Sequence, residues 1–387
     1  MAKKYFFVPF SLLFGMQAQS QKTDAGIAMK TVDSSIFQDA AHHWYDILEK
    51  EAVIHPAPGK PKFSATQLNA IGDNILLYQK ENGGWPKNYD MLAILSDRQK
   101  DTLLSFKNAI NTTFDNRTTY TQIATLAKIY YVTKEVKYKD AAIKGLQFIL
   151  TAQYANGGWP QYFPLEKGYS RYITFNDDAY SGIMWLLKDI ADGKVQYDFI
   201  DAALKQKLQQ AFSKGLDCIL KTQINDMGKP TAWCQQYDET TLEPTWARTF
   251  EPPSICNGES VDIVLLLMSI KNPDHAIIDA VENAVAWFND SKINGIRVKT
   301  IDAPEMLTKY RISKTDRIVV ADTAAPPIWT RYYELKTHRP LFCNREYKLV
   351  YSLAEVDRER RDGYTWYTNE PQKVLNRYEA WKKKIAR

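Results

Sequence analysis

The sequence predicts an all-α fold, a partial α/α barrel: a toroid of antiparallel helical hairpins with long loops and a few short strands. A repeat is the first observation. Leu77–Pro86 recurs as Thr151–Pro160, and a weaker copy runs from Ile219 to Trp233, at intervals of about 70 residues. An interval of this size holds two helices with their connections, so one period corresponds to one hairpin. The second observation is that strand patterns are scarce, being confined to residues 295–300 and 317–320.

Each copy of the repeat is an amphipathic segment that stops at Asn or Gly before a tryptophan loop, which is typical of a helix end. Between the copies, apolar residues at i, i+3 and i+4 predict further helices. These cover residues 119–131, 179–190, 200–220, 261–270 and 277–288. Residues 290–375 are poorer in this pattern and are expected to wrap the barrel as long loops.

The N-terminus has the layout of a secretory signal peptide. Lys3 and Lys4 precede a short apolar run, and Ala18 follows as a small residue at a plausible cleavage point. We therefore expect a leader at residues 1–20 and a secreted or periplasmic protein. No later run is long enough to span a membrane. The remainder, 21–387, is expected to be one catalytic domain, with a helical extension at 21–75 and the barrel core at 76–387.

The composition is that of an ordinary globular chain, with 45% hydrophobic and 25% charged residues. A net charge of +5 over 387 residues is too mild to indicate a nucleic-acid partner. We separately expect the protein to be a monomer. Aromatic residues make up 13% of the chain, and such rings also form stacking platforms in sugar-binding clefts. Trp85, Trp159 and Trp233, one in each repeat, are candidates either for stacking on sugars or for core packing.

The four cysteines are Cys218, Cys234, Cys256 and Cys343. None forms a CxxC pair and no histidine lies at zinc-like spacing, which disfavours a metal–thiolate site. In an exported protein some could be joined, for example Cys234 with Cys256. Buried free thiols are the other possibility, and the spacing leaves both open.

Polar clusters precede three of the predicted helices: residues 114–119, 174–178 and 254–260. Asn, Asp and Ser are common helix caps, so any one cluster has a simple structural explanation. Alternate helices of a hairpin repeat begin at the same end of a barrel, however, so the clusters would meet in one cleft. Their oxygen ligands suit calcium. The side chains are Asp115, Asn116, Asn176, Asp177 and Glu259.

Arginines gather downstream, where a carboxylated polymer would need them, because a guanidinium grips a carboxylate with two hydrogen bonds. They are Arg248, Arg331, Arg339 and Arg345. Each could instead be a solvated charge or a salt-bridge partner, and Arg248 with Glu251 is one such possible pair.

Taken together, the short motifs of this chain resemble those of polysaccharide lyase family ten, the pectate lyases. The matching segments span about residues 78–367: Asn82-Gly83-Gly84-Trp85-Pro86-Lys87-Asn88, Asp115-Asn116, Thr174-Phe175-Asn176-Asp177, Trp233-Cys234, Ala247-Arg248, Glu251 with Ser254, Gly258-Glu259-Ser260, Arg331-Tyr332-Tyr333, Arg345, and Arg360-Arg361-Asp362-Gly363-Tyr364-Thr365-Trp366.

The resemblance implies calcium-dependent cleavage of polygalacturonate, with Arg248 as the base. It places Asp115 and Asp177, with Asn116 and Asn176, at the calcium. It also assigns substrate binding to Arg331, Arg345, Lys87, Trp233 and Glu251.

Three loops depart from the family pattern. Residues 117–119 replace Gly-Ala-Thr, Pro252 and Pro253 make one run unusually proline-rich, and Arg345-Glu346-Tyr347 replaces an Arg-Asp-Gly turn. The departures put substrate length and esterification in doubt more than the reaction.

The implied reaction is β-elimination, in which a base removes the C5 proton of a galacturonate and the C4 oxygen leaves. Arginine has a pKa above about 12. Crowding by calcium and other cations is expected to lower it, and an alkaline optimum follows.

Two other functions fit parts of the pattern. A glycoside hydrolase would use two carboxylates, such as Asp177 and Glu259, and no metal. A carbohydrate-binding protein would keep the aromatic residues and arginines without turnover.

Overall fold

The computed structural model describes residues 30–46, 53–54, 59–307 and 312–386; the predicted leader lies outside these ranges. The helices are α2 (Gln38–Asp46), α3 (Leu68–Tyr78), α4 (Asp97–Ser105), α5 (Tyr120–Thr133), α6 (Val136–Ala152), α7 (Ala179–Ala191), α8 (Ala202–Thr222), α9 (Asn257–Met268), α10 (His275–Asp290), α11 (Arg358–Gly363) and α12 (Pro371–Ile385). Short 3-10 turns are η1 (Ser34–Phe37), η2 (Tyr169–Arg171), η3 (Asn176–Asp178), η4 (Val195–Tyr197) and η5 (Leu353–Glu355).

The strands are β1 (Ile173–Thr174), β2 (Asn225–Asp226), β3 (Lys229–Pro230), β4 (Gln236–Tyr237), β5 (Ile255–Cys256), β6 (Ile296–Leu307), β7 (Ile312–Ala321), β8 (Trp329–Thr330), β9 (Tyr332–Tyr333), β10 (Pro340–Asn344), β11 (Lys348–Val350) and β12 (Tyr367–Thr368). All of these pair antiparallel, and the largest described sheet has the order β11-β10-β9-β5.

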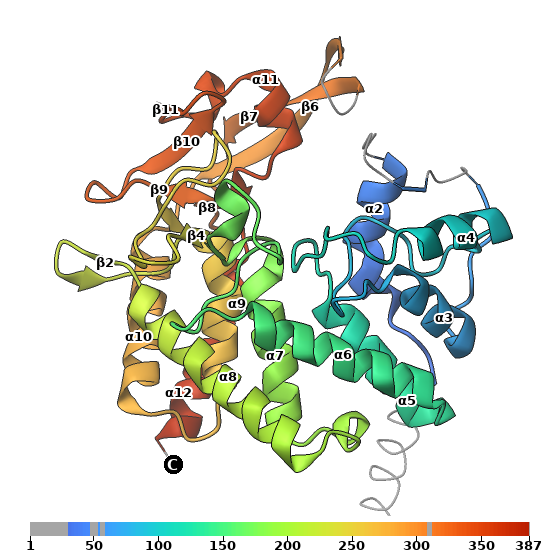
Figure 1. The fold of residues 1–387 in the computed structure, drawn as a ribbon. Helices are drawn as coiled ribbons and strands as arrows, with labels where there is room; N and C mark the ends of the chain where they lie inside the picture. Colours follow the sequence, from blue (N-terminus) through green and yellow to red (C-terminus); the bar gives the residue numbers. More distant parts are fainter. Residues whose placement is uncertain (1–29, 47–52, 55–58, 308–311, 387) are drawn as a thin grey trace, which may run out of the picture.

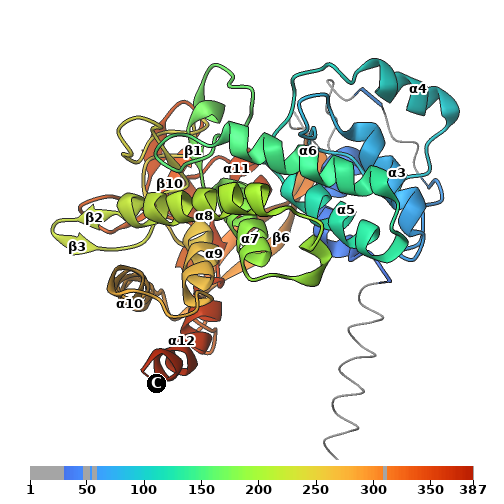
Figure 2. The same ribbon diagram turned by 60° about the horizontal axis from the view of Figure 1, so that its bottom comes forward.

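The helices form two rows, which follow from the repeat (Figures 1 and 2). One row is α5, α7, α9 and α12, in which each helix contacts the next. The other is α3, α6, α8 and α10, and these helices pack against the first row. The chain alternates between the rows, so α5, α7 and α9 all begin at the same end of the molecule. The functional residues gather at that end.

The repeat has the same hydrogen bonds in every copy. The side-chain nitrogen of Gln79 donates to Gly83 O and to Ala141 O of α6, the helix that follows α3 in the same row. Gln153 and Gln223 repeat this bridge with their own loops and with α8 and α10. Each Gln therefore ties a helix end to its neighbour, which explains why the residue recurs.

The expectation of an all-α fold with long C-terminal loops is wrong. Residues 290–375 contain β6 to β12, including the β6–β7 hairpin, whose strands have 12 and 10 residues. In Figure 1 this strand-rich part, orange to red, lies above α8 to α10. The sequence indicated only residues 295–300 and 317–320 of this hairpin. Most residues of both strands are exposed or half-buried, so the remaining parts of the strands have no apolar face from which to predict them. The fold is mixed, with helical rows and several small sheets.

The chain before the repeat packs onto the rest through α2. Phe37 and Trp44 are buried in the core, and the Trp44 indole donates to Ile54 O at 3.0 Å. Tyr45 donates its hydroxyl to Asp90, 3.1 Å away. These contacts place α2 beside the functional end of the two helical rows (Figure 1).

All four cysteines are buried free thiols in this structure, so the possible Cys234–Cys256 disulfide is not formed. None of the helices within the described residues is long and apolar enough to cross a membrane.

Candidate active site

The polar clusters before α5, α7 and α9 do not cap these helices. Thr119, Asp178 and Cys256 occupy the three N-cap positions, and none of their side chains makes a capping hydrogen bond. The simple structural explanation of the clusters therefore fails.

The loops are instead held in left-handed backbone conformations. Asn116 and Arg117 have φ of 50° and 58°, and Asp177 and Asp178 have φ of 50° and 57°. Such conformations are unfavourable for residues with a Cβ and concentrate at functional sites.

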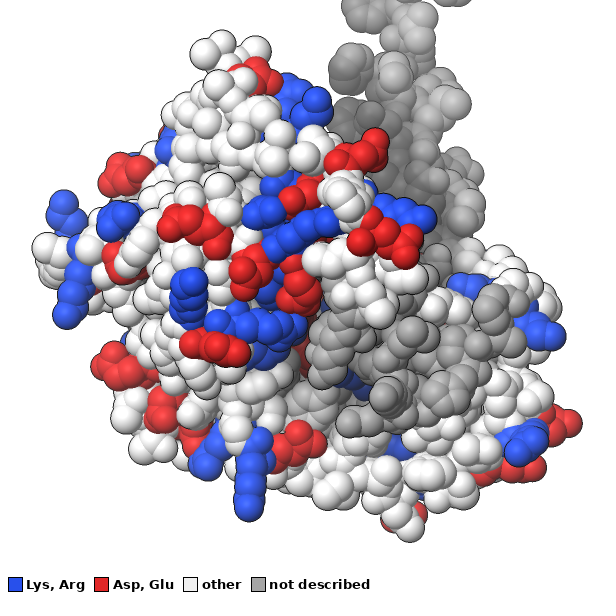
Figure 3. All heavy atoms as spheres, turned by 90° about the horizontal axis from the view of Figure 1, so that it is seen from above, with Lys and Arg blue, Asp and Glu red and all other residues white. Residues whose placement is uncertain are grey.

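Two cavities of about 690 and 710 Å³ open at this end of the molecule. The first, the Arg248 cavity, is also lined by Asp115 and Lys87; the second, the Glu259 cavity, by Arg331. Both are lined by Asp177, which lies where they meet. Figure 3 shows acidic and basic side chains interleaved across this face.

Asp115 is buried and carries a negative charge. Its Oδ2 accepts from the ammonium group of Lys87, 2.5 Å away. Burial opposes ionisation, but Lys87 outweighs it and Arg248 adds to the effect, so the pKa of Asp115 is lowered. Its other oxygen, Oδ1, is buried without a hydrogen-bond partner. A buried carboxylate oxygen of this kind is satisfied by a water molecule or an ion.

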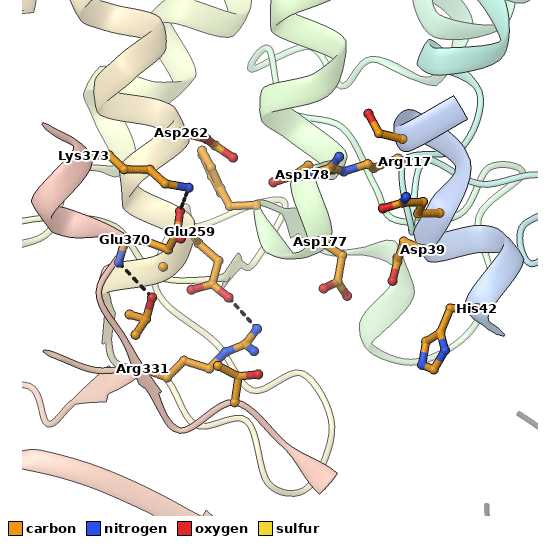
Figure 4. A pocket seen from close by; sticks show the side chains of 16 residues that line it. Asp39, His42, Arg117, Asp177, Asp178, Glu259, Asp262, Arg331, Glu370 and Lys373 are labelled. Carbon is orange, nitrogen blue, oxygen red and sulfur yellow. Dashed lines mark hydrogen bonds and ion pairs between the residues drawn. The ribbon is translucent and has the colours of Figure 1, made fainter. Parts of the chain in front are cut away.

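Asp177, from the loop before α7, lines the Arg248 cavity together with Asp115, and Figure 4 shows its side chain in the Glu259 cavity. Its side chain is open to the cavity, but surrounding protein and the nearby Asp115 carboxylate raise its pKa to about 7. Arg331 and Arg248 oppose this rise. Two carboxylates that disfavour each other's ionisation are relieved by a cation between them.

The two amides beside these carboxylates have different surroundings. Asn116 donates its side-chain nitrogen to Asn88 Oδ1, at 2.8 Å. Asn176 donates to Asp177 Oδ2 and accepts a hydrogen bond from Arg331 at 2.7 Å. Its amide oxygen is therefore engaged, and Asn176 orients Asp177 in this structure.

The residues present fit a hard cation. Asp115 Oδ1 and Gln161 Oε1 are both buried oxygens without a hydrogen-bond partner, and both residues line the Arg248 cavity. No group of three or more His, Cys, Asp or Glu side chains is arranged to hold a metal in the described part of the chain. Protein carboxylates would therefore supply only part of a coordination shell, leaving the remainder to amides, water or substrate.

Arg248 is fixed by a two-pronged ion pair. Its Nε lies 2.8 Å from Glu251 Oε2, and its Nη2 lies 2.5 Å from Oε1. Glu251 also accepts from the Tyr364 hydroxyl at 2.9 Å. Only 1% of the Glu251 side chain is exposed, whereas 43% of the Arg248 side chain is. Glu251 therefore lies beneath Arg248 and positions it, while still lining the Arg248 cavity.

The ion pair also acts on protonation. Desolvation of the guanidinium by the surrounding protein favours its neutral form. The Glu251 carboxylate outweighs this effect, so the pKa of Arg248 is raised. Among the protein groups, the charged partner nearest to Arg248 is an anion, so the expected lowering of this pKa would have to come from a bound cation.

Arg331 and Arg345 are placed differently. Arg331 is 16% exposed and donates to Glu259 at 2.5 Å (Figure 4). Its guanidinium lies over the ring of Tyr364. Arg345 is 42% exposed and pairs with Glu359 at 3.1 Å. Both line the cavities, Arg331 in a fixed position and Arg345 at a more open edge.

Trp233 does not reach the site. Its side chain is fully buried, and its indole nitrogen donates to Ile219 O. Trp85 and Trp159 are buried in the same way, with hydrogen bonds to Ile75 O and Ile149 O. All three tryptophans are core residues that hold the repeat together, so any ring that stacks on sugar must come from elsewhere.

The sequence did not indicate several residues of the site. Tyr364 lies in the motif at residues 360–366, but its contacts with Glu251 and Arg331 arise only in the folded structure. Asp39 and His42 of α2 line both cavities, and no pattern in the sequence places α2 there (Figure 4). They are found only from the packing of α2.

Comparison with known families gives a match to pectic acid lyase over residues 79–375. Among solved structures, a family 10 polysaccharide lyase from Cellvibrio cellulosa has 30% sequence identity and a TM-score of 0.68, covering 82% of this chain and 96% of that one. A mutant of that lyase in complex with trigalacturonic acid has 29% identity and a TM-score of 0.67, with the same coverage. A comparison with curated proteins found no match.

Proposed function

The chain belongs to the pectic acid lyase family and is a pectate lyase of polysaccharide lyase family ten, and we propose the details of its reaction from this premise. The proposed reaction is calcium-dependent β-elimination in α-1,4-linked polygalacturonate. Arg248 acts as the base, and the products are unsaturated oligogalacturonides. The observation that carries this proposal is the fixed, cavity-facing guanidinium of Arg248 beside Asp115 and Asp177.

Polygalacturonate fits the distribution of charges. Arg331, Arg345 and Lys87 line the two cavities and offer donors to the carboxylates of successive sugars. The similar lyase bound to trigalacturonic acid supports this choice of substrate.

Asp115 and Asp177 would hold calcium, with Asn116 beside them and Asn176 orienting Asp177. When bound, calcium supplies a positive charge that stabilises the negative charge developing on the sugar carboxylate. Lys87 keeps Asp115 ionised for this role, since it lowers the pKa of that carboxyl.

Arg248 performs the proton transfer. Glu251 engages Nε and Nη2, so Nη1 is the guanidinium nitrogen outside the ion pair and the one that takes the C5 proton. The electrons of the C5–H bond form the C4–C5 double bond as the C4–O bond breaks, and water protonates the leaving oxygen.

Glu251 and Tyr364 hold Arg248 in one orientation, which lowers the entropic cost of reaching the transition state. Because Glu251 raises the pKa of Arg248, the neutral form becomes available only at alkaline pH.

Export through a signal peptide and a monomeric state remain proposals. N-terminal sequencing of the protein recovered from outside the cytoplasm tests the first, and light scattering tests the second.

The deciding experiment measures ultraviolet absorbance of the unsaturated uronate while the purified protein acts on polygalacturonate at alkaline pH. We expect a steady rise with calcium and none with a chelator. Calcium added back after chelation should restore the rise. New reducing ends without absorbance would indicate hydrolysis and overturn β-elimination.

A further inference from the structure

A turn at the edge of the Arg248 cavity carries an aromatic ring in an unfavourable backbone conformation. Asn344 of β10 pairs with Lys348 of β11, so residues 345–347 form the turn. Glu346 and Tyr347 have φ of 63° and 64°. This left-handed region suits glycine and is unfavourable for a residue with a Cβ such as tyrosine. The chain therefore accepts backbone strain in order to place a tyrosine here.

Core packing does not explain the tyrosine. Its side chain is 56% exposed, so burial offsets little of the strain. The ring instead packs edge-to-face on Trp246, with centroids 4.8 Å apart and planes at 83°. Trp246 is itself only partly buried. The two rings, called here the Trp246–Tyr347 pair, form an aromatic surface that faces solvent.

The pair is fixed to the active site on both sides. Tyr347 donates its backbone N–H to Thr249 O at 2.9 Å, and Thr249 follows Arg248 directly. Arg345 belongs to the same turn and lines the Arg248 cavity. The guanidinium groups of Arg248 and Arg345 both lie over the ring of Phe250, at 4.8 and 5.2 Å. The pair does not line the cavity itself and lies at its rim, where Tyr347 shares the turn of Arg345.

A long polysaccharide leaves such a cavity across its rim. Each pyranose ring has an apolar face of C–H groups, which packs on aromatic rings in water. Stored strain at a solvent-facing residue beside a catalytic centre is a sign of function. The buried tryptophans of the repeat cannot serve this purpose.

We propose that the Trp246–Tyr347 pair is an outer subsite that binds the pyranose ring of a galacturonate beyond the one held at Arg345. The inference rests on the proposed function for the identity of the polymer. Stacking uses the apolar face of the sugar and not its carboxylate. The subsite therefore accepts methyl-esterified and free galacturonate alike.

The test is the variant Tyr347→Gly, which removes the ring and relieves the strain. kcat/KM is measured for a galacturonate hexamer and a trimer, because only the longer chain spans the centre and the rim. The hexamer-to-trimer ratio should fall about fivefold, equivalent to about 1 kcal/mol. The melting temperature should be retained, because glycine suits this backbone. Tyr347→Phe keeps the ring and should keep the ratio.

A matched control is Lys134→Gly. Lys134 also has a positive φ, 59°, at the C-terminal end of α5, and it lines neither cavity. It should retain stability and leave the ratio unchanged.

An unchanged ratio in Tyr347→Gly would overturn the subsite. If the wild-type protein forms no unsaturated product, the proposed function fails instead. Calorimetric titration of the hexamer into wild type and Tyr347→Gly then decides the subsite alone, because no turnover interferes.

Discussion

Glu251 holds Arg248 through both carboxylate oxygens, three residues away in sequence and almost fully buried beneath it. Such a pair fixes the orientation of a guanidinium more firmly than a single hydrogen bond does. It also raises the pKa of the group that acts as the base. The geometry and the pH dependence of the reaction therefore depend on the same carboxylate.

Glu251→Gln tests this link. The amide keeps the size of the side chain but removes its charge, so the pKa of Arg248 should fall. We expect the rising limb of the kcat profile to move to lower pH, and the maximal kcat to drop about a hundredfold because Arg248 is held less firmly. A profile that keeps its position would show that Arg248 is not the group that titrates.

Arg248→Ala should abolish lyase activity and also destabilise the protein. It leaves the buried Glu251 carboxylate without its cation, which costs about 3 kcal/mol in comparable cases. The double variant Arg248→Gln with Glu251→Gln should recover most of the free energy of unfolding but no activity. Denaturant unfolding and product absorbance separate the two effects. Activity in the double variant would contradict the role of Arg248.

Calcium should stabilise the protein in a pH-dependent way through Asp177. The folded-state pKa of Asp177 is raised to about 7, from an unfolded-state value of 3.8. The folded protein therefore favours protonated Asp177. The stability that this preference contributes is fully present below pH 3.8 and is lost as the pH rises through 7. Without calcium the melting temperature should therefore fall over this interval.

Calcium added at pH 8 should restore the melting temperature, because it binds only the folded form, and should do little at pH 5. Asp177→Asn should be less sensitive to both pH and calcium. The same calcium response in this variant would place the cation elsewhere.

Asp262→Asn should stabilise the protein at neutral and alkaline pH. Asp262 is partly buried, and burial followed by the nearby Asp178 carboxylate raises its pKa to about 7. Its charged form therefore destabilises the folded state as the pH rises through 7. We expect a gain of about 1 kcal/mol at pH 8 and none at pH 4, measured by denaturant unfolding. Asp217→Asn, at an exposed position of α8, is the control and should change little.

Arg345→Ala and Arg331→Ala should differ in kinetics, because the two arginines differ in burial. Arg345 is exposed at the rim and pairs with Glu359, so its loss should raise KM about tenfold with a small change in kcat. Arg331 is enclosed and holds Asn176 and Glu259 in place, so its loss should lower kcat and the melting temperature as well. Equal effects from both variants would contradict separate roles.

The sequence by itself determined the features that depend on local pattern. The repeat predicted the helical hairpins, and the structure contains α5, α7, α8 and α10 within a few residues of the expected positions. The short motifs indicated the pectate lyase family, which the comparisons confirm. The possible pairing of Arg248 with Glu251 was also visible, because the residues are three apart.

The tertiary structure alone decided features that depend on distant contacts. The two-residue strands, such as β5 and β9, exist only because their partners are brought together, so no local pattern predicts them. Trp85, Trp159 and Trp233 became core residues because each buried indole found a backbone carbonyl. The pairing of Arg331 with Glu259 joins residues 72 positions apart. Side-chain pattern predicts a helix from its own residues, whereas burial and ion pairing are properties of the assembled fold.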